Sequence, residues 1–174
     1  MKVILEAPSQ KRRVEFLRAV SRSRRLHRPW GSAPNTARAF NASLKRLALP
    51  AHAGFWVVTE GGELAGVINI NEIVRGSFCS GYLGYYAFMP HNGRGYMTGG
   101  LRAVLAAAFG RLRLHRIEAN IQPQNEPSRR LVQRLGFRLE GFSPHYLNIR
   151  GVWRDHERWA ITLEDWRVQK AKTS

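Results

Sequence analysis

The spacing of apolar residues predicts a strand, a turn and a helix at the centre of the chain. Residues 78–89 are almost all aromatic, apolar or small, which is typical of a buried strand. Apolar residues then recur at i, i+4, i+7, i+8 and i+11, which is one stripe at helical period. The members of this stripe are Met97, Leu101, Val104, Leu105 and Ala108. Residues 90–96 therefore form the turn that joins the strand to the helix.

The same two periods place the other elements and predict an α+β fold. Strands are expected at 3–6, 55–59, 64–71, 116–121, 137–141 and 152–163, and helices at 9–25, 36–49 and 128–135. Glu60-Gly61-Gly62-Glu63 marks a hairpin turn. The expected buried residues are Val14, Phe16, Leu17 and Val20 in the first helix and Ala39, Phe40, Leu44 and Leu47 in the second. This order predicts one mixed, mostly antiparallel sheet with helices on both faces.

Length and composition fit a single domain that spans residues 1–174. We expect residues 167–174 to form a flexible basic tail. No stretch has the length of a membrane span or the pattern of a signal peptide. Cys79 is the only cysteine, so no internal disulfide can form and a cytoplasmic protein is expected. No His, Cys and Asp residues are spaced like metal ligands, so we expect no metal.

The net charge of +16 is the one extreme value of the composition. It predicts attraction to polyanions such as cofactor phosphates or RNA and says nothing about the fold. Much of this charge lies in and just after the first helix, where Glu15 is the only acidic residue. The basic residues there are Lys11, Arg12, Arg13, Arg18, Arg22, Arg24, Arg25 and Arg28. They form either a solvated face or a contact surface for ribosomal RNA or an acidic partner, with strong salt dependence.

Gly93 and Gly95 give the central turn the features of an anion site. The first amides of a helix have no partner within the helix, and the helix dipole favours negative charge there. Glycines remove the side chains that would keep a phosphate from the backbone. The same Gly-x-Gly pattern also fits an ordinary strand-to-helix connection, so the turn needs support from other motifs.

Several sequence blocks occur in an order found in one family of enzymes. The blocks are Ile73-Val74-Arg75-Gly76-Ser77-Phe78, Tyr82-Leu83-Gly84-Tyr85, Asn125-x-x-Ser128, Leu135-Gly136-Phe137-x-x-Glu140-Gly141, Tyr146-Leu147-x-Ile149-x-Gly151-x-Trp153-Arg154-Asp155-His156 and Asp165-Trp166. With them the chain resembles the GCN5-related N-acetyltransferase (GNAT) superfamily. Within it, the chain is most similar to the Rim-type ribosomal-protein-alanine N-acetyltransferases, especially the RimJ type. The resemblance is dense from about Gly66 to Trp166 and thin before Phe55.

The resemblance implies acetyl-CoA as the cofactor and a sheet that splays between its fourth and fifth strands. The diphosphate would lie on the turn and the pantetheine arm along the end of the fourth strand. The residues implied to bind the cofactor are Asn92, Gly93, Arg94, Gly95, Tyr96 and Met97 in the turn, Ala87, Phe88 and Met89 in the strand, and Asn125 and Ser128 beyond it. Asn125 is equally a candidate helix N-cap.

Two positions depart from the family pattern. Pro90 stands where relatives usually have Gln or Arg, so it offers no side-chain donor, and binding depends more on backbone amides and Arg94. Gly99-Gly100 replaces a frequent Glu-Ala pair, at a cost of about 1 kcal/mol per glycine in a helix. These glycines soften the start of the helix unless close packing against a strand or the cofactor requires them.

The implied reaction transfers an acetyl group to a protein α-amine. An α-amine titrates near ~8 and lysine near ~10.4, so more of the α-amine is neutral at cytosolic pH. A backbone amide between Ala87 and Met89 would polarise the thioester carbonyl. Ser128 is implied to be the general acid, or it bonds only to backbone. His145 or Glu72 could be the general base, although His145 is also explained as a surface residue and Glu72 as the partner of an arginine.

The acceptor implied by the resemblance is a protein N-terminus, on a small-subunit ribosomal protein that begins with Ala or Ser. Trp30, Tyr146 and Asn148 are candidates to border its path, and Trp30 is alternatively a packed side chain. A related enzyme that acetylates a small amine or a lysine is the first alternative. A basic RNA- or ribosome-binding protein that keeps the fold is the second. The sequence leaves the choice between monomer and dimer open.

Overall fold

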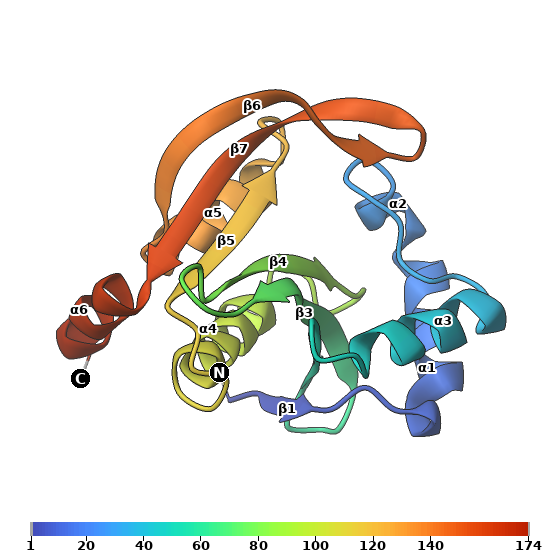
Figure 1. Ribbon diagram of the computed structural model, residues 1–174. Coiled ribbons are helices and arrows are strands. Elements are labelled where there is room, and N and C mark those ends of the chain that lie inside the picture. Colours follow the sequence, from blue (N-terminus) through green and yellow to red (C-terminus); the bar gives the residue numbers. More distant parts are fainter. Residues whose placement is uncertain (1, 174) are drawn as a thin grey trace.

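The computed structural model describes residues 2–173, which contain a seven-stranded sheet (Figure 1). Its strands lie in the order β1-β2-β3-β4-β5-β7-β6, and within these residues β4 and β5 are the only parallel pair. The strands are β1 (Ile4–Glu6), β2 (Ala53–Val58), β3 (Leu64–Val74), β4 (Ser80–Ala87), β5 (Arg116–Ile121), β6 (Arg138–Ile149) and β7 (Val152–Thr162). The predicted mixed, mostly antiparallel sheet is confirmed.

Helices cover both faces of this sheet, as predicted. They are η1 (Gln10–Arg12), α1 (Arg13–Arg22), α2 (Arg24–His27), α3 (Ala37–Leu47), α4 (Tyr96–Phe109), α5 (Glu126–Arg134) and α6 (Leu163–Thr173). On one face lie α4 and α5, and on the other α1 and α3. Among residues 2–173, no helix combines the length and the apolar character needed to cross a bilayer.

The predicted stripe of α4 is the centre of the larger core. Four of its residues have no exposed surface: Leu101, Val104, Leu105 and Ala108. Gly100 lets the helix lie close to the sheet, because a Cβ at this position would sit 2.5 Å from Cγ2 of Val57. Close packing against a strand therefore explains Gly100, and the structure gives no such reason for Gly99.

The first helix differs from the prediction in two ways. It breaks at Ser23 into α1 and α2, where the buried Ser23 side chain accepts a hydrogen bond from the amide of Met89. Val14, which we expected to be buried, is 58% exposed. It precedes Phe16 by two residues, about 200° around a helix, so it points outward when Phe16 packs inward. Ala19 is buried in its place.

The closing strands form one long hairpin that arches away from the rest of the sheet (Figure 1). We predicted strands only at 137–141 and 152–163, but β6 continues to Ile149. Pro144 has no N–H to donate, and the pairing with β7 shifts register between Ser143 and Leu147. Because β6 is an edge strand, it tolerates both a proline and a bulge. Pro144 therefore disturbs the pairing of β6 only locally and does not end the strand.

Residues 163–173 form α6, so residues 167–173 of the segment that we expected to be a flexible tail are helical, and residue 174 lies outside the described residues. Thr162 and Asp165 form a reciprocal cap, in which Asp165 Oδ2 accepts from the Thr162 amide (3.0 Å) and Thr162 Oγ1 accepts from the Asp165 amide (3.3 Å). Trp166 then packs against Phe109 with 6.1 Å between ring centroids. The cap fixes the start of this helix, and the aromatic contact packs it against α4.

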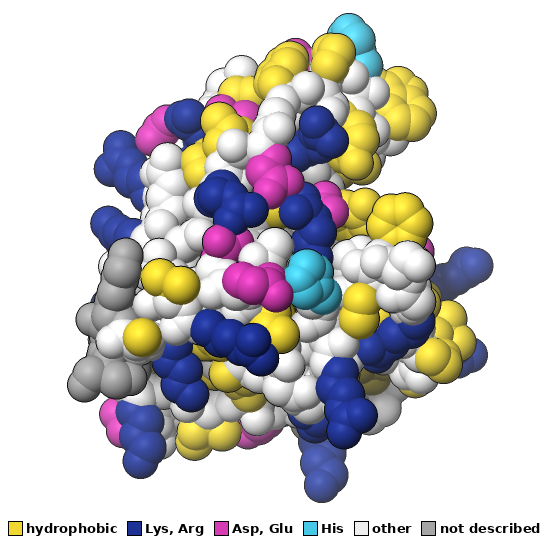
Figure 2. Space-filling model, turned by 60° about the vertical axis from the view of Figure 1, so that its left-hand side comes forward, with side chains coloured by type: hydrophobic (Ala, Val, Ile, Leu, Met, Phe, Trp, Pro, Cys, Tyr) yellow, Lys and Arg dark blue, Asp and Glu magenta, His cyan; other side chains and the backbone are white. Residues whose placement is uncertain are grey.

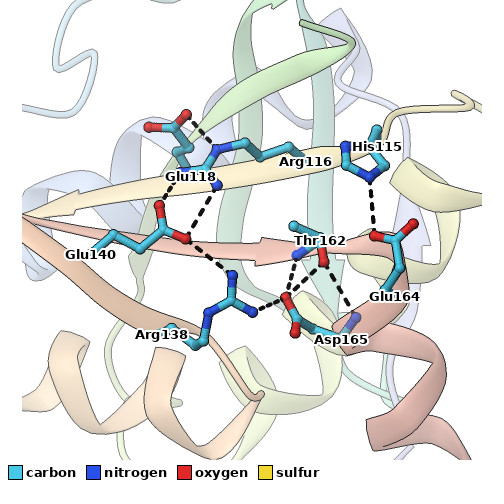
Figure 3. Close-up of polar contacts among 8 residues, drawn as sticks. All are labelled: His115, Arg116, Glu118, Arg138, Glu140, Thr162, Glu164 and Asp165. Carbon is cyan, nitrogen blue, oxygen red and sulfur yellow. Dashed lines mark hydrogen bonds and ion pairs between the residues drawn. The ribbon is translucent and has the colours of Figure 1, made fainter.

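Ion pairs join β5, β6 and α6 (Figure 3). Arg116 contacts Glu118 and Glu140, and Arg138 contacts Glu140 and Asp165. Hydrogen bonding to Arg116 lowers the pKa of Glu140. Figure 2 brings the α6 side of the molecule forward and shows acidic and basic side chains interspersed on it. The arginines of this network therefore pair with carboxylates of the chain and connect its elements.

Candidate active site

Strands β4 and β5 separate after three residue pairs. They pair from Ser80 with Arg116 to Tyr82 with Glu118. Beyond Tyr82, the edge of β4 that faces β5 has no strand partner in the described chain, which confirms the predicted splay. A cavity of about 670 Å³ opens at this split, within the size range of small-molecule sites. Its walls come from α2 and the loop after it, Arg46 of α3, the middle of β3, the end of β4, the turn before α4 with the first turn of that helix, and α5.

The glycine turn supplies one end of the cavity, including Asn92, Gly93, Gly95 and Met97. Gly93 (φ +73°) and Gly95 (φ +84°) adopt the left-handed conformation, and a Cβ at either position would meet nothing within 4 Å. Open space thus borders the backbone there. Gly95 is the N-cap of α4, whose first amides have no partner within the helix. The residues present fit the diphosphate of CoA.

The positive charge at the cavity comes from other residues than Arg94, which we predicted. Arg94 is exposed and lies outside the cavity wall, and Tyr96 packs its ring against His91 with 5.5 Å between centroids. Arg130 and Arg134 of α5 line the cavity instead, and their i, i+4 spacing in a predicted helix was the available signal. The described lining includes no Asp or Glu. The cavity therefore favours an anionic ligand.

We expected one of three backbone amides at the end of β4 to polarise a carbonyl group, and only one of the three points into the split. The Phe88 amide donates to the Ala65 carbonyl (2.8 Å), and the Met89 amide donates to Ser23 Oγ (2.9 Å). Successive N–H groups of a strand point to opposite edges, so the Ala87 amide points toward the split. Ala87 lines the cavity, whereas Phe88 and Met89 do not. The candidate donor is therefore the amide of Ala87.

Ser128 of α5 and Tyr85 of β4 meet across the split. Their hydroxyl oxygens are 2.5 Å apart, and both residues line the cavity. Burial raises the pKa of Tyr85 to about 12, so its hydroxyl stays protonated at neutral pH. Asn125 also lines the cavity and is confirmed as the N-cap of α5, because its Oδ1 accepts from the Ser128 amide (3.3 Å). We did not predict a role for Tyr85, although it ends one of the blocks on which the resemblance rests.

The two candidate bases lie away from the cavity wall. His145 has an 81% exposed side chain in the β6–β7 hairpin, and its backbone amide donates to Asp155 Oδ1 at 2.8 Å. This agrees with the interpretation of His145 as a surface residue. Glu72 is exposed beside the register shift between β3 and β4 and forms no ion pair within residues 2–173. The structure brings neither group to the split.

One of the three candidate acceptor residues reaches the cavity. Trp30 lines it, while Tyr146 and Asn148 do not. The Tyr146 ring packs against His156 with 6.2 Å between centroids, and Asn148 Oδ1 accepts from the Gly151 amide (2.8 Å) in the hairpin turn. The loop between α2 and α3 therefore lines the described cavity, whereas the tip of the hairpin does not. We call the wall at Trp30 the acceptor side because Trp30 is a candidate to border the acceptor.

Two histidines that we did not single out line the cavity. His27 Nε2 lies 2.7 Å from the Ala87 carbonyl oxygen, and burial lowers the pKa of this imidazole. His91 is 8% exposed, its Nε2 lies 3.6 Å from Glu63, and its Nδ1 has no partner in the described part of the chain. No periodicity or motif marks either residue in the sequence, because their positions depend on how the turns fold.

The comparisons with known proteins agree with this geometry. The family described as an acetyltransferase (GNAT) domain matches residues 2–138. This chain belongs to the GNAT family. Acetyl-CoA is the acetyl donor of that family, which supports the predicted cofactor.

This GNAT chain has relatives that include an enzyme named for acetylating a ribosomal protein. It is 43% identical over 104 residues to the ribosomal protein uS5-alanine N-acetyltransferase of Escherichia coli (strain K12), an alignment that covers 60% of this chain and 54% of the relative. It is 38% identical over 114 residues to the probable N-acetyltransferase YjcK of Bacillus subtilis (strain 168), covering 66% and 62%. The aligned part thus spans between about half and two thirds of these curated relatives.

Two solved structures share the fold over nearly all of the chain. Mycobacterium smegmatis RimJ in complex with CoA-disulfide superposes with a TM-score of 0.87 and 27% identity, covering 98% of this chain and 89% of that one. The ribosomal-protein-S5-alanine acetyltransferase of Vibrio fischeri gives a TM-score of 0.84 and 26% identity, covering 95% and 96%. These similarities confirm the GNAT fold and the predicted resemblance to the RimJ type.

Proposed function

We propose that this protein transfers the acetyl group of acetyl-CoA to the α-amine of a protein N-terminus, in the cavity between β4 and β5. One observation carries the proposal. The free amide of Ala87 and the hydroxyl of Ser128 lie in the same cavity as the open glycine turn before α4. That turn suits a diphosphate, so a thioester arm extending from it along β4 would end near the two donors.

Each donor has a task in the reaction. As the N–C bond forms and the C–S bond breaks, one proton leaves the amine and one must reach the sulfur. The Ala87 amide would stabilise the negative charge that develops on the carbonyl oxygen. Ser128 would give a proton to the sulfur, with the protonated hydroxyl of Tyr85 at 2.5 Å to replace it. A water chain suffices as base for an amine that is partly neutral.

The lining of the cavity supports a protein α-amine over a polyamine. A polyamine carries several positive charges and would be repelled by Arg130 and Arg134, with no carboxylate among the described lining residues to offset them. An α-amine carries at most one charge and is partly neutral at cytosolic pH, and its lower pKa favours it over lysine.

The acceptor that we propose is a small-subunit ribosomal protein with N-terminal Ala or Ser. This choice is supported by the relatives, two of which are named for the alanine of ribosomal protein uS5 or S5. It would place the reaction in the cytoplasm. An enzyme that acetylates a small amine or a lysine remains the alternative, and the test below distinguishes the two.

The test uses a panel of acceptors with labelled acetyl-CoA. One peptide has a free N-terminal Ala and no lysine, a second has the same sequence with a blocked N-terminus, and a third has a blocked N-terminus and an internal lysine. Spermidine is the fourth acceptor. We expect label only on the free α-amine, and a large loss of kcat in Ser128→Ala. Label confined to the lysine peptide or to spermidine would overturn the proposed acceptor.

We propose in addition that α1 and α2 contact RNA, which would bring the enzyme to its acceptor. The observation in favour is that the arginines along these helices are exposed and form no ion pair with other described residues. An enzyme with a net charge of +16 would be repelled by a basic free acceptor. An RNA that binds both would remove this repulsion.

A further inference from the structure

A short segment, residues 23–30, bridges the two sides of the split sheet. Ser23 Oγ and His27 Nε2 bond to the end of β4, at the Met89 amide (2.9 Å) and the Ala87 carbonyl oxygen (2.7 Å). At the other end, the Trp30 carbonyl oxygen accepts from Gln122 Nε2 at 3.2 Å. Gln122 directly follows β5. We call this segment the strap, and it spans the opening into which a thioester would insert.

The strap fixes the peptide groups that follow the candidate donor. The Ala87–Phe88 peptide group is held on both sides, its N–H by the Ala65 carbonyl (2.8 Å) and its C=O by His27. The Phe88–Met89 group is also held on both sides, by Ser23 and by the amide of His91 (2.9 Å). Because neighbouring peptide planes share a Cα, the bond to His27 limits the directions in which the Ala87 N–H can point.

His27 is held as a neutral donor. It is 9% exposed, and its ring lies against Tyr86 and Phe88, at 5.1 Å and 5.9 Å between centroids. Burial lowers the pKa of His27, so the imidazole is uncharged at neutral pH. A carbonyl oxygen only accepts, so the proton of the neutral ring must be on Nε2. This nitrogen is therefore committed to Ala87 and cannot also take a proton from the amine.

We infer that His27 is a positioning residue for acetyl transfer, which holds the Ala87 amide in the direction that a carbonyl oxygen needs. The inference rests on the proposed function, since it concerns the same site. It adds that the strap connects the acceptor side of the cavity to the amide that would bind the carbonyl oxygen, so a displacement of one would displace the other. Leu26 and Trp30, which line the acceptor side, belong to the same strap.

The test compares three variants with the wild type. His27→Leu removes the donor, His27→Gln keeps an N–H at a similar reach, and Ser23→Ala removes the acceptor of the Met89 amide. His115→Leu is the control, because this exposed histidine lies on the α6 side of the molecule, beside Glu164. The measurements are kcat and KM for acetyl-CoA and peptide, the pH profile of kcat, and hydrogen exchange of the Phe88 and Met89 amides.

We expect kcat of His27→Leu to fall about 10-fold or more, since a misplaced oxyanion donor costs rate rather than binding. KM should stay within about threefold, His27→Gln should recover most of the rate, and the pH profile should keep its shape. The Phe88 and Met89 amides should exchange faster in His27→Leu and Ser23→Ala.

Two results would overturn the inference. One is a His27→Leu enzyme with the kcat and amide exchange of the wild type. The other is a His27→Gln enzyme as slow as His27→Leu with the acidic limb of its pH profile lost, which would make His27 a proton acceptor. If the wild type acetylates lysine instead of α-amines, the same kcat comparison on a lysine peptide decides the role of His27 separately from the proposed acceptor. If His27→Leu does not fold, His27→Gln and Ser23→Ala decide through amide exchange.

Discussion

Arginines on two parts of the molecule differ in whether they form ion pairs. Along α1 and α2 six of them are exposed and have no ion-pair partner within residues 2–173: Arg13, Arg18, Arg22, Arg24, Arg25 and Arg28. Across β5, β6 and α6, Arg116 and Arg138 each contact two carboxylates (Figure 3). The first group is therefore available to an external anion, whereas the second donates its hydrogen bonds to carboxylates within the fold.

The comparison shows what a high net charge does in this chain. A guanidinium paired with carboxylates contributes little field at a distance, whereas an unpaired one attracts any nearby phosphate. The charge of +16 therefore acts from particular surfaces and not from the molecule as a whole. Three experiments can break or sharpen this distinction.

The largest effect is expected on RNA binding. Arg18 and Arg22 lie one turn apart on α1, and Arg25, which is also exposed, belongs to α2. We expect the triple change to Glu to weaken binding of an RNA hairpin about 100-fold at moderate salt and to reduce the slope of log K against log salt by about three. Fluorescence anisotropy over a range of salt concentrations measures both.

The control makes the same charge change elsewhere, at the exposed Arg102, Arg111 and Arg167. Its RNA affinity should remain within about threefold of the wild type. Equal losses in the two triple variants would mean that net charge alone is responsible and that α1 and α2 are not a contact surface. Acetylation of a free peptide should be unchanged by Arg18→Glu and Arg22→Glu, because these two arginines neither line the cavity nor belong to the strap.

A smaller effect is expected on stability when the paired network is broken. Glu140→Gln keeps the shape of the side chain but removes the charge shared by Arg116 and Arg138. We expect the free energy of unfolding to fall by about 1 kcal/mol. The corresponding loss in Tm is about 2–4 °C for a domain of this size. Calorimetry would measure it, with Glu60→Gln in the exposed β2–β3 turn as the control. A variant as stable as this control would show that the network is incidental.

The pH dependence of that loss has a defined sign. Hydrogen bonding to Arg116 lowers the pKa of Glu140 in the folded protein, so the folded state favours the carboxylate. Its contribution is present above the ordinary Glu pKa of about 4.5 and is lost as the pH falls through the lowered value. The stability difference between wild type and Glu140→Gln should therefore shrink on acidification. A difference that grows toward low pH would contradict this assignment.

The smallest effect is expected for the unpaired group. Neutralising Arg18, Arg22 and Arg25 together as Gln should change the free energy of unfolding by no more than about 0.5 kcal/mol. Denaturant titration at neutral pH measures this value. A destabilisation as large as that of Glu140→Gln would mean that these arginines support the fold after all.

Periodicity predicted the elements whose burial is regular. The helix of Leu101 and Val104 and the order of the strands along the chain were predicted in this way, because these elements carry regular apolar patterns. The hairpin β6–β7 was only partly found, since Pro144 interrupts an edge strand that the fold tolerates. Thr162-x-x-Asp165 has the spacing of a helix cap, but the polar stretch that follows gave no apolar period to predict α6.

The candidate site divides in a similar way. The glycine turn, Ser128 and Asn125 follow from short motifs, because their spacing within one turn and one helix sets their geometry. His27 and Ser23 could not be predicted, since their partners lie about 60 residues away, at the end of β4 and just after it. The choice of Ala87 among three amides required the strand register. His145 and Glu72 looked suitable by residue type, yet the fold places both outside the cavity wall.

The claim that acetyl-CoA binds in this cavity, with its diphosphate on the glycine turn, is tested most directly by calorimetric titration of CoA into two matched variants. Gly93→Val and Gly76→Val impose similar backbone strain, because both glycines have φ near +70° and open space around them, but only Gly93 lines the cavity. We expect one CoA to bind the wild type and Gly76→Val alike, and Gly93→Val to bind at least about 10-fold more weakly. Binding of equal strength to all three proteins, or none to the wild type, would contradict the account.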